Sequence, residues 1–276
     1  MRPSIRRALA MSLAIQGVGS IAPFLTVILL ARIYGPESQG VFSTFKTWVD
    51  LISSIIIFGF PQAFVYLINK GLADRTLLLN TTILYTLGST LFVAPLAIHS
   101  VYSGYIEIPD GQSLVTYAVM VSIGLGAFIL NRLVRAIYIT VDDGFLFSLI
   151  TSAPAFFVMA TMLFTAGRDQ FDYDLAYAIA GFLTCMVTLV WIRRIVAQSG
   201  SYKFALTALP RKVLAHQSIH TFVQSISFSL QPVVTIYLLT GFGANIVDIA
   251  IFTASTLIIA AVNVFFGIIA PVFFNR

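Results

Sequence analysis

The sequence predicts an all-α, multi-pass membrane protein of about eight transmembrane helices with a cytoplasmic N-terminus. First, 58% of its 276 residues are hydrophobic and only 10% are charged, whereas soluble proteins average roughly 25% charged residues. Second, long apolar stretches recur along the chain. Third, the Lys and Arg residues fall mainly on one side of the predicted membrane. These features exclude a cytosolic enzyme, a secreted domain and a disordered chain.

Each predicted span is long enough to be a helix, since crossing a bilayer takes about 20 mostly apolar residues. Hydrocarbon offers no partners to backbone N–H and C=O groups, which favours helices. A membrane β-barrel would show shorter, alternating segments. The predicted spans lie near residues 9–31, 41–68, 76–98, 113–130, 145–166, 175–196, 214–239 and 248–274. Turn-forming residues such as Gly35-Pro36 and Asp143-Gly144 separate them.

The orientation follows from the positive charges, because cytoplasmic loops are enriched in Lys and Arg. With the N-terminus inside, 13 of the 16 Lys and Arg residues lie at the inner side. The exceptions are Arg32, Lys46 and Arg168. Most acidic residues fall outside. The inner set is Arg2, Arg6, Arg7, Lys70, Arg75, Arg132, Arg135, Arg193, Arg194, Lys203, Arg211, Lys212 and Arg276, and the outer acidic set is Glu37, Glu107, Asp110, Asp169, Asp172, Asp174 and Asp248.

The spans suggest two unequal parts. We expect a first six-helix lobe over residues 1–197, a cytoplasmic linker over 198–213, and the first two helices of a second lobe over 214–276. The first and seventh spans run in the same direction and share a pattern: Gln16 and Gln224 each lie 19 residues before a glycine, Gly35 and Gly243. Such a pattern is what two parallel lobes would produce.

The seventh span carries a polar stripe, defined here as His216, His220, Gln224, Ser227 and Gln231. Their spacing of three and four residues puts them on one helical face. A single polar residue in a membrane helix can serve to hold helices together. Five in a row favour a face that lines water or a polar ligand. His220, Gln224 and Gln231 are therefore candidate cavity residues, and Gln16 on the first span joins them as a weaker match.

Charged residues within spans are the sharpest pointers, because they are costly in hydrocarbon. Lys46 and Asp50 lie four residues apart in the second span and can pair on one face. The pair is either an ion pair near the interface, with Lys46 reaching outward, or part of a substrate cavity. Arg132 and Arg135 end the fourth span. They either follow from the orientation or bind an anionic headgroup.

Other chemistries have little support. The basic residues sit at membrane edges, so no nucleic-acid partner is expected. His216 and His220 have the spacing of a metal pair but no carboxylate or cysteine near them in sequence, so we expect no metal and no cofactor. The loops are short and hold no catalytic set of Ser, His and Asp, so an enzyme is not expected. The lone Cys185 cannot form an internal disulfide.

The segment after the first span, Leu30-Ala31-Arg32-Ile33-Tyr34-Gly35-Pro36-Glu37-Ser38-Gln39-Gly40-Val41-Phe42, resembles the outer-loop signature of polysaccharide flippases. These belong to the multidrug/oligosaccharidyl-lipid/polysaccharide exporter superfamily. Phe58-Gly59-Phe60-Pro61-Gln62-Ala63 is similar to the family's glycine-containing run at the end of the second helix, and Asp248 to Phe252 lies where its eighth helix usually starts, with Phe252 replacing a usual tyrosine.

This resemblance implies a transporter in the bacterial inner membrane that moves a polyprenyl-diphosphate-linked oligosaccharide by alternating access. It also implies membrane lipid as surroundings and a coupling cation, H⁺ or Na⁺. Family members have two six-helix lobes, so we expect this chain to be a truncated or split member that is inactive alone. The seventh span lacks an acidic residue that many relatives carry there, which leaves the coupling ion open.

Two alternatives stay open. A multidrug or cation antiporter of the same superfamily would need carboxylates in its cavity, and Asp50 is the only acid placed clearly inside a span. A non-catalytic structural membrane protein would need no polar residues or prolines in its spans. The sequence has both.

Overall fold

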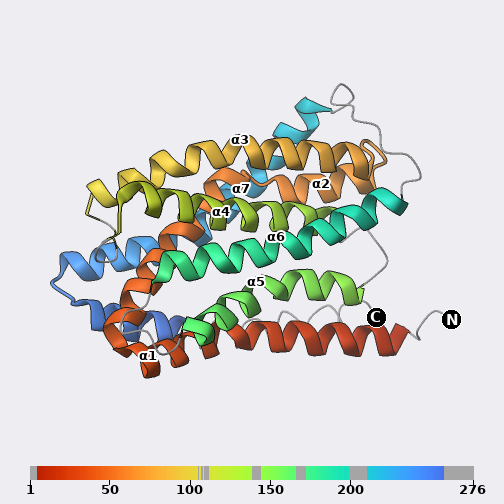
Figure 1. The fold of residues 1–276 in the computed structure, drawn as a ribbon. Coiled ribbons are helices and arrows are strands. Elements are labelled where there is room, and N and C mark those ends of the chain that lie inside the picture. The colour runs from red at the N-terminus through yellow and green to blue at the C-terminus, as the bar shows by residue number, and fades with distance from the viewer. Residues whose placement is uncertain are drawn as a thin grey trace.

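The computed structural model describes residues 5–104, 106, 108, 112–138, 144–165, 172–198 and 210–257; the side chains of 5–16, 18, 20, 144–148, 165 and 198 are not described. The elements are α1 Ile5–Ile57, α2 Phe60–Asn69, α3 Arg75–Tyr102, α4 Leu114–Tyr138, α5 Gly144–Thr165, α6 Tyr173–Gln198 and α7 Arg211–Gly241. A further helical segment covers Ile246–Leu257. The all-α fold class is confirmed (Figure 1).

The predicted spans correspond closely to these helices. Five helical stretches are long and apolar enough to cross a membrane: Ile21–Asn69, Arg75–Tyr102, Leu114–Tyr138, Tyr173–Ala197 and Arg211–Gly241. Two shorter apolar stretches, Leu149–Phe164 and Ile246–Leu257, match the fifth and eighth predicted spans. Residues 258–274 of the eighth span and most of the predicted linker lie outside the described residues, so the division into lobes stays a prediction.

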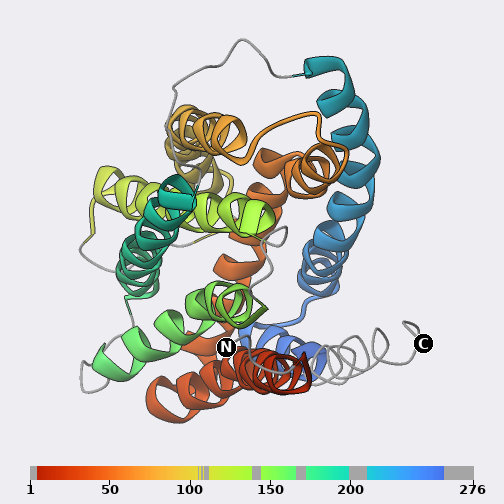
Figure 2. The ribbon, with the colours of Figure 1, turned by 90° about the vertical axis from the view of Figure 1, so that its right-hand side faces the viewer.

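Helix α1 contains the first predicted span and most of the second. The predicted turn at Tyr34-Gly35-Pro36 is a corner of one residue: only Gly35 leaves helical geometry, with φ of 90°. Glycine tolerates this conformation. Pro36 then begins the second half of α1, where its fixed φ suits the first turn of a helix and its missing N–H is not needed. Figure 2 shows the second half of α1 rising through the middle of the bundle.

The second predicted span, residues 41–68, belongs to one apolar stretch but is interrupted by a short break. It breaks at Phe58 and Gly59, whose φ angles are 49° and 71°, and α2 restarts directly after them with Pro61 in its first turn. Two backbone carbonyls at this break accept hydrogen bonds from side chains of other helices. The Tyr85 hydroxyl donates to the Ile56 carbonyl, and Thr221 Oγ1 donates to the Gly59 carbonyl over 3.0 Å. Such partners are required inside a membrane.

The helices form a bundle in which α4 packs between α3 and α6, while α5 packs against α1 and α6, and α7 packs against α1 and α2 (Figures 1 and 2). At Gly124 and Gly181, α4 and α6 approach so closely that a Cβ on Gly181 would lie 2.5 Å from the Gly124 Cα. Small residues permit such close approach in membrane bundles, where van der Waals packing holds helices together.

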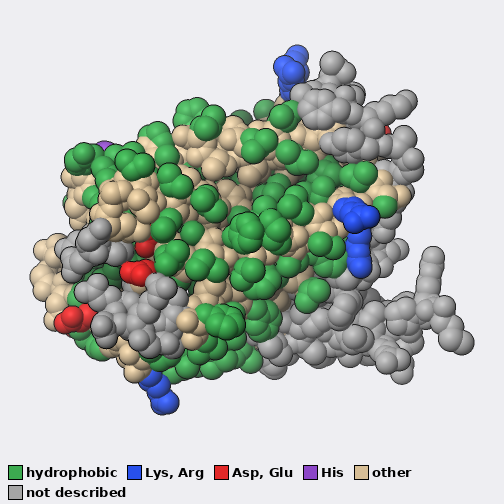
Figure 3. Space-filling view, viewed as in Figure 1, with side chains coloured by type: hydrophobic (Ala, Val, Ile, Leu, Met, Phe, Trp, Pro, Cys, Tyr) green, Lys and Arg blue, Asp and Glu red, His purple; other side chains and the backbone are tan. Residues whose placement is uncertain are grey.

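The outer surface of the bundle suits lipid. On α3, Leu87, Leu91 and Phe92 are 64%, 77% and 70% exposed. In Figure 3 hydrophobic side chains cover the middle of the visible face, and the described charged side chains lie toward its two ends. This distribution is the one that a membrane-spanning bundle requires, because acyl chains replace water around its middle.

Gly59 is a sensitive position in this fold. A Cβ there would lie 2.3 Å from the Ser218 carbonyl oxygen and 2.8 Å from the Phe222 nitrogen, both backbone atoms of α7. Gly71 also has positive φ, 66°, but has no atom within 4 Å of an added Cβ. Alanine at either site strains the backbone by roughly 1–2 kcal/mol, and overpacking at Gly59 adds about 1–3 kcal/mol.

We therefore predict that Gly59→Ala lowers the thermal unfolding midpoint of the detergent-purified protein clearly more than Gly71→Ala does. Thermal unfolding followed by circular dichroism or by tryptophan fluorescence measures the difference. Equal losses for the two variants would show that α7 does not pack against this break.

Candidate functional site

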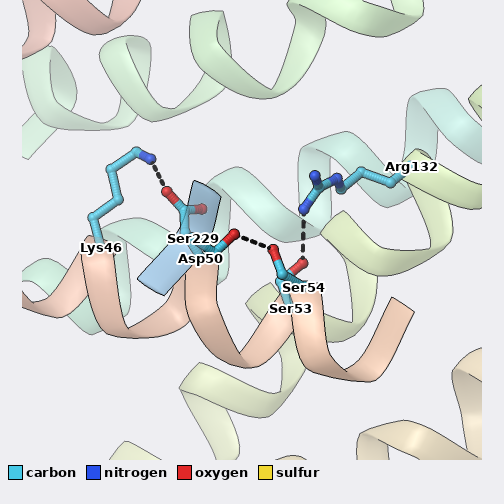
Figure 4. A network of polar contacts seen from close by, with 6 residues as sticks. All are labelled: Lys46, Asp50, Ser53, Ser54, Arg132 and Ser229. Atoms are coloured by element: carbon cyan, nitrogen blue, oxygen red, sulfur yellow. Dashed lines mark hydrogen bonds and ion pairs between the residues drawn. The ribbon is translucent and has the colours of Figure 1, made fainter. Parts of the chain in front are cut away.

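A network of polar contacts joins three helices, α1, α4 and α7 (Figure 4). The second half of α1 supplies Lys46, Asp50, Ser53 and Ser54, near the middle of the 36–69 stretch. Arg132 of α4 and Ser229 of α7 complete it. Residues 46, 50, 53 and 54 are spaced for one helical face, so the sequence of α1 itself gathers these groups on one side.

Lys46 and Asp50 form the predicted ion pair, Nζ to Oδ2. Within the described ranges it is the one ion pair between side chains. The side chains are 49% and 56% exposed. Both charges lie in an apolar stretch long enough to cross the membrane, where an ionised side chain usually faces a bundle interior or a water-filled cavity. The mutual attraction of Lys46 and Asp50 is therefore not enough, and the pair also needs polar surroundings.

Arg132 lies six residues before the end of α4, and its Nη1 donates to Ser53 Oγ over 3.2 Å. No described carboxylate lies within ion-pair distance of its guanidinium. Arg135, one turn further on, lies close enough for the two like charges to interact. A guanidinium has five N–H donors in a planar fork that suits carboxylates and phosphates. Arg132 therefore keeps donors available for an anionic group.

Three members of the network were missed by sequence reasoning. Ser54 and Ser229 share a hydrogen bond of 2.7 Å that ties α1 to α7, and Ser53 bonds Arg132. The spacing of Ser53 and Ser54 from Asp50 was a signal that could have been used. Tyr177 of α6 also belongs here: its hydroxyl interacts electrostatically with both Asp50 and Arg132, and its ring packs against Phe45 and Phe128.

The polar stripe of α7 lies elsewhere. The helix packs on α1 and α2 through Ser218, Thr221, Phe222 and Ser229, and the stripe residues lie on the opposite face, where all five are exposed. The rings of His216 and His220 contact each other edge to face. No hydrogen bond or ion pair links His220, Gln224 or Gln231 to Lys46, Asp50 or Arg132 in the described structure. That the stripe lines a cavity stays a prediction. The side chain of Gln16 lies outside the described residues.

The outer-loop signature has a structural role in joining α1 to the helical segment Ile246–Leu257. Gln39 is 3% exposed, and its Nε2 donates to the Ala250 carbonyl and to Thr253 Oγ1, each over 3.2 Å. A Cβ on Gly40 would lie 2.3 Å from the Ile246 carbonyl oxygen. The Gln39 amide and the missing side chain of Gly40 therefore let the two helices touch.

Asp174, which the sequence analysis assigned to the outer acidic set, lies in the first turn of α6. Its full burial was not predicted, because a residue at a predicted span boundary can fall on either side of it. Among the described residues, no three His, Cys, Asp or Glu side chains gather as they would around a metal ion.

Three solved structures share this fold. A MOP superfamily transporter from Pyrococcus furiosus, described as having a binding pocket of reverse polarity that suggests a different function, superposes with a TM-score of 0.62 at 15% identity, covering 92% of this chain and 58% of its own. A multidrug resistance MATE family transporter of the MOP superfamily in an outward-facing conformation superposes with a TM-score of 0.61 at 15% identity. That match covers 92% of this chain and 60% of the transporter. A MATE protein in complex with Br-NRF superposes with a TM-score of 0.56 at 14% identity, and the match covers 94% of this chain and 65% of the MATE protein.

These matches establish the fold: the chain has the helix arrangement of part of a MOP superfamily transporter, and it spans less than two thirds of the length of those structures. The low identity leaves the substrate open. No family model and no curated protein matches the sequence.

We predict that Gln39→Leu lowers the thermal unfolding midpoint, because it leaves the Ala250 carbonyl and the Thr253 hydroxyl without this donor. The loss is about 0.5–1.5 kcal/mol for each hydrogen bond removed, because the Thr253 hydroxyl still bonds the Ala250 carbonyl. Ser38→Ala is the matched control, since the Ser38 hydroxyl bonds only the Tyr34 carbonyl of its own helix among the contacts described. An equal effect of both variants would contradict the role given to Gln39.

Proposed function

We propose that this chain forms part of a MOP-type transporter that exports a polyprenyl-diphosphate-linked oligosaccharide across a bacterial inner membrane by alternating access. The fold supports the transporter class, because similar chains are transporters. The signature around Gly35-Pro36-Glu37 and Gly40 supports the flippase branch. The main support for an anionic cargo is Arg132, a cation within an apolar span. Its described hydrogen-bond partner is Ser53, and no described carboxylate pairs with it.

The chemistry of the cargo fits this position. A diphosphate needs charge-assisted hydrogen bonds when it leaves water, and a guanidinium supplies two parallel N–H donors to neighbouring oxygens. Arg135 adds a second positive charge nearby. Sugar hydroxyls are neutral and would bind the Lys46–Asp50 pair. The lipid tail would remain in the bilayer, next to the apolar outer faces of the helices.

A cation antiporter is the second candidate, because Asp50 is accessible and two of the similar structures are MATE proteins. Asp50 is, however, paired with Lys46, which neutralises the charge that a cationic drug would need. A structural membrane protein explains the network less well, since accessible charges inside a span destabilise a scaffold that binds nothing. The network therefore favours an anionic cargo.

The test is substitution of Arg132 in protein reconstituted into liposomes that carry a fluorescent polyprenyl-diphosphate oligosaccharide. Arg132→Gln removes the charge and the fork, and we predict a loss of transport of at least about tenfold, since hydrogen bonds to charged groups are worth about 1.5–3 kcal/mol. Arg132→Lys keeps the charge alone and should give an intermediate rate. Delivery of labelled lipid to the opposite leaflet is measured by quenching.

Arg193→Gln serves as the control, because Arg193 is exposed on α6 and no described contact involves it. Full transport by Arg132→Gln would refute the anionic site. Efflux of a cationic dye that requires Asp50 and tolerates Arg132→Gln would establish the antiporter instead.

A further inference from the structure

Tyr177 of α6 lies beside the Lys46–Arg132 network, and the function proposed above gives it no role. Its side chain is 8% exposed. Its hydroxyl is close enough to Asp50 of α1 and Arg132 of α4 to interact electrostatically with both. Tyr177 therefore brings a further helix, α6, to the network.

The Tyr177 ring is held between the two helices that carry these charges. On α1, the Phe45 ring meets it edge to face, with 5.3 Å between the ring centroids. On α4, Phe128 lies one turn before Arg132, and its ring centroid is 4.7 Å from that of Tyr177. A Cβ on Gly124 would lie 2.4 Å from Tyr177 Cδ1, so α4 has no side chain where the ring lies. This packing fixes the direction of the hydroxyl.

The hydroxyl that is held in this way has no hydrogen-bond partner among the described residues. Its oxygen is not sealed inside the bundle, unlike that of Tyr117. The neighbouring charged groups have partners of their own, because Asp50 pairs with Lys46 and Arg132 bonds Ser53. A tyrosine O–H is a hydrogen-bond donor. It therefore remains available beside a guanidinium that also has spare donors.

We propose that the Tyr177 hydroxyl donates a hydrogen bond to the same phosphate group that Arg132 binds. This inference rests on the function proposed above and adds a second cargo-binding side chain to it. A phosphate that leaves water needs donors from several directions, whereas the N–H groups of one guanidinium all lie in one plane. A hydroxyl on a ring that is already fixed adds a donor from another helix and loses little rotamer freedom on binding.

The charges around the hydroxyl permit an anion. The Asp50 carboxylate by itself would repel a phosphate, but its pairing with Lys46 offsets that charge. Arg132 then leaves the three groups with one net positive charge, from two cations and one anion. Phospholipid headgroups carry the same phosphate chemistry as the cargo, so the experiment has to separate these two sources.

A purely structural role for the tyrosine is the main alternative. Phenylalanine would fill that role equally well, because the described contacts of Tyr177 with other side chains are ring contacts. A hydroxyl that acts only on Asp50 is the second alternative, and its effect would not depend on Arg132. Substitutions that remove the hydroxyl with and without Arg132 distinguish all three roles.

The experiment measures the dissociation constant of the fluorescent polyprenyl-diphosphate oligosaccharide for detergent-purified protein by fluorescence anisotropy. Tyr177→Phe keeps the ring and should raise this constant about tenfold, since a hydrogen bond to a charged group is strong enough for that ratio. In an Arg132→Gln background the same change should have less than about a threefold effect, because donors to one phosphate group are coupled.

Tyr117→Phe is the matched control and should leave the dissociation constant unchanged. Tyr117 is also fully buried and its ring contacts Tyr173 of α6. Its hydroxyl, however, interacts with Ser100 and Asp174 and not with the network. In a competition arm, inorganic pyrophosphate should displace the cargo and phosphatidylglycerol should not. Displacement by phosphatidylglycerol at equal concentration would assign the site to a lipid headgroup and overturn the cargo assignment.

Unchanged cargo affinity of Tyr177→Phe would overturn the proposal, and so would effects of Tyr177→Phe and Arg132→Gln that multiply fully in the double variant. If Tyr177→Phe does not fold, 3-fluorotyrosine at position 177 gives the decision: its ¹⁹F resonance must shift when cargo is added, and must not shift with Arg132→Gln. Normal cargo binding by Tyr177→Phe together with weak binding by Arg132→Gln refutes this inference alone. Normal binding by Arg132→Gln refutes the proposed function.

Discussion

The arrangement of this protein depends on the contact between the backbone of α7 and the break in the second span. Gly59 lets α7 approach α1 and α2 so closely that no side chain fits between them. The Thr221 hydroxyl donates a hydrogen bond to the Gly59 carbonyl, and Ser229 on the same face of α7 shares a hydrogen bond with Ser54. Because α7 packs through this face, its polar stripe must point the other way. The same contact brings α7 beside the Lys46–Arg132 network.

The network places accessible charged side chains within apolar spans, which a purely structural role does not explain. In hydrocarbon every charge and every free backbone group needs a partner. The apolar outer face of α3 obeys that rule, and the carbonyls at the break are bonded to Tyr85 and Thr221. Lys46, Asp50 and Arg132 instead remain accessible. The simplest physical account is that water and a polar cargo reach this part of the protein.

The sequence predicted the helices well, because apolar length and charge position act over whole spans. The sequence did not predict features that depend on the packing of single residues. Phe58 adopts a positive φ that its side chain disfavours and that only the packing around it explains. Asp174 could be placed in a loop or in a helix until its burial was known. Lys46 and Asp50 pair as expected because their spacing is local. Arg132 meets Ser53, and Ser229 meets Ser54, through tertiary packing that brings α4 and α7 to α1.

Cysteine labelling measures directly whether water reaches the Lys46–Arg132 network. In a Cys185→Ser background, Asp50→Cys and the lipid-facing Leu91→Cys, whose native side chain is 77% exposed, are placed singly in protein reconstituted in nanodiscs. A charged, water-soluble thiosulfonate is then added, and the rate of modification is followed by mass spectrometry. If water reaches the network, Asp50→Cys is modified fast and Leu91→Cys almost not at all. An Asp50→Cys that reacts no faster than Leu91→Cys would contradict water access to the network.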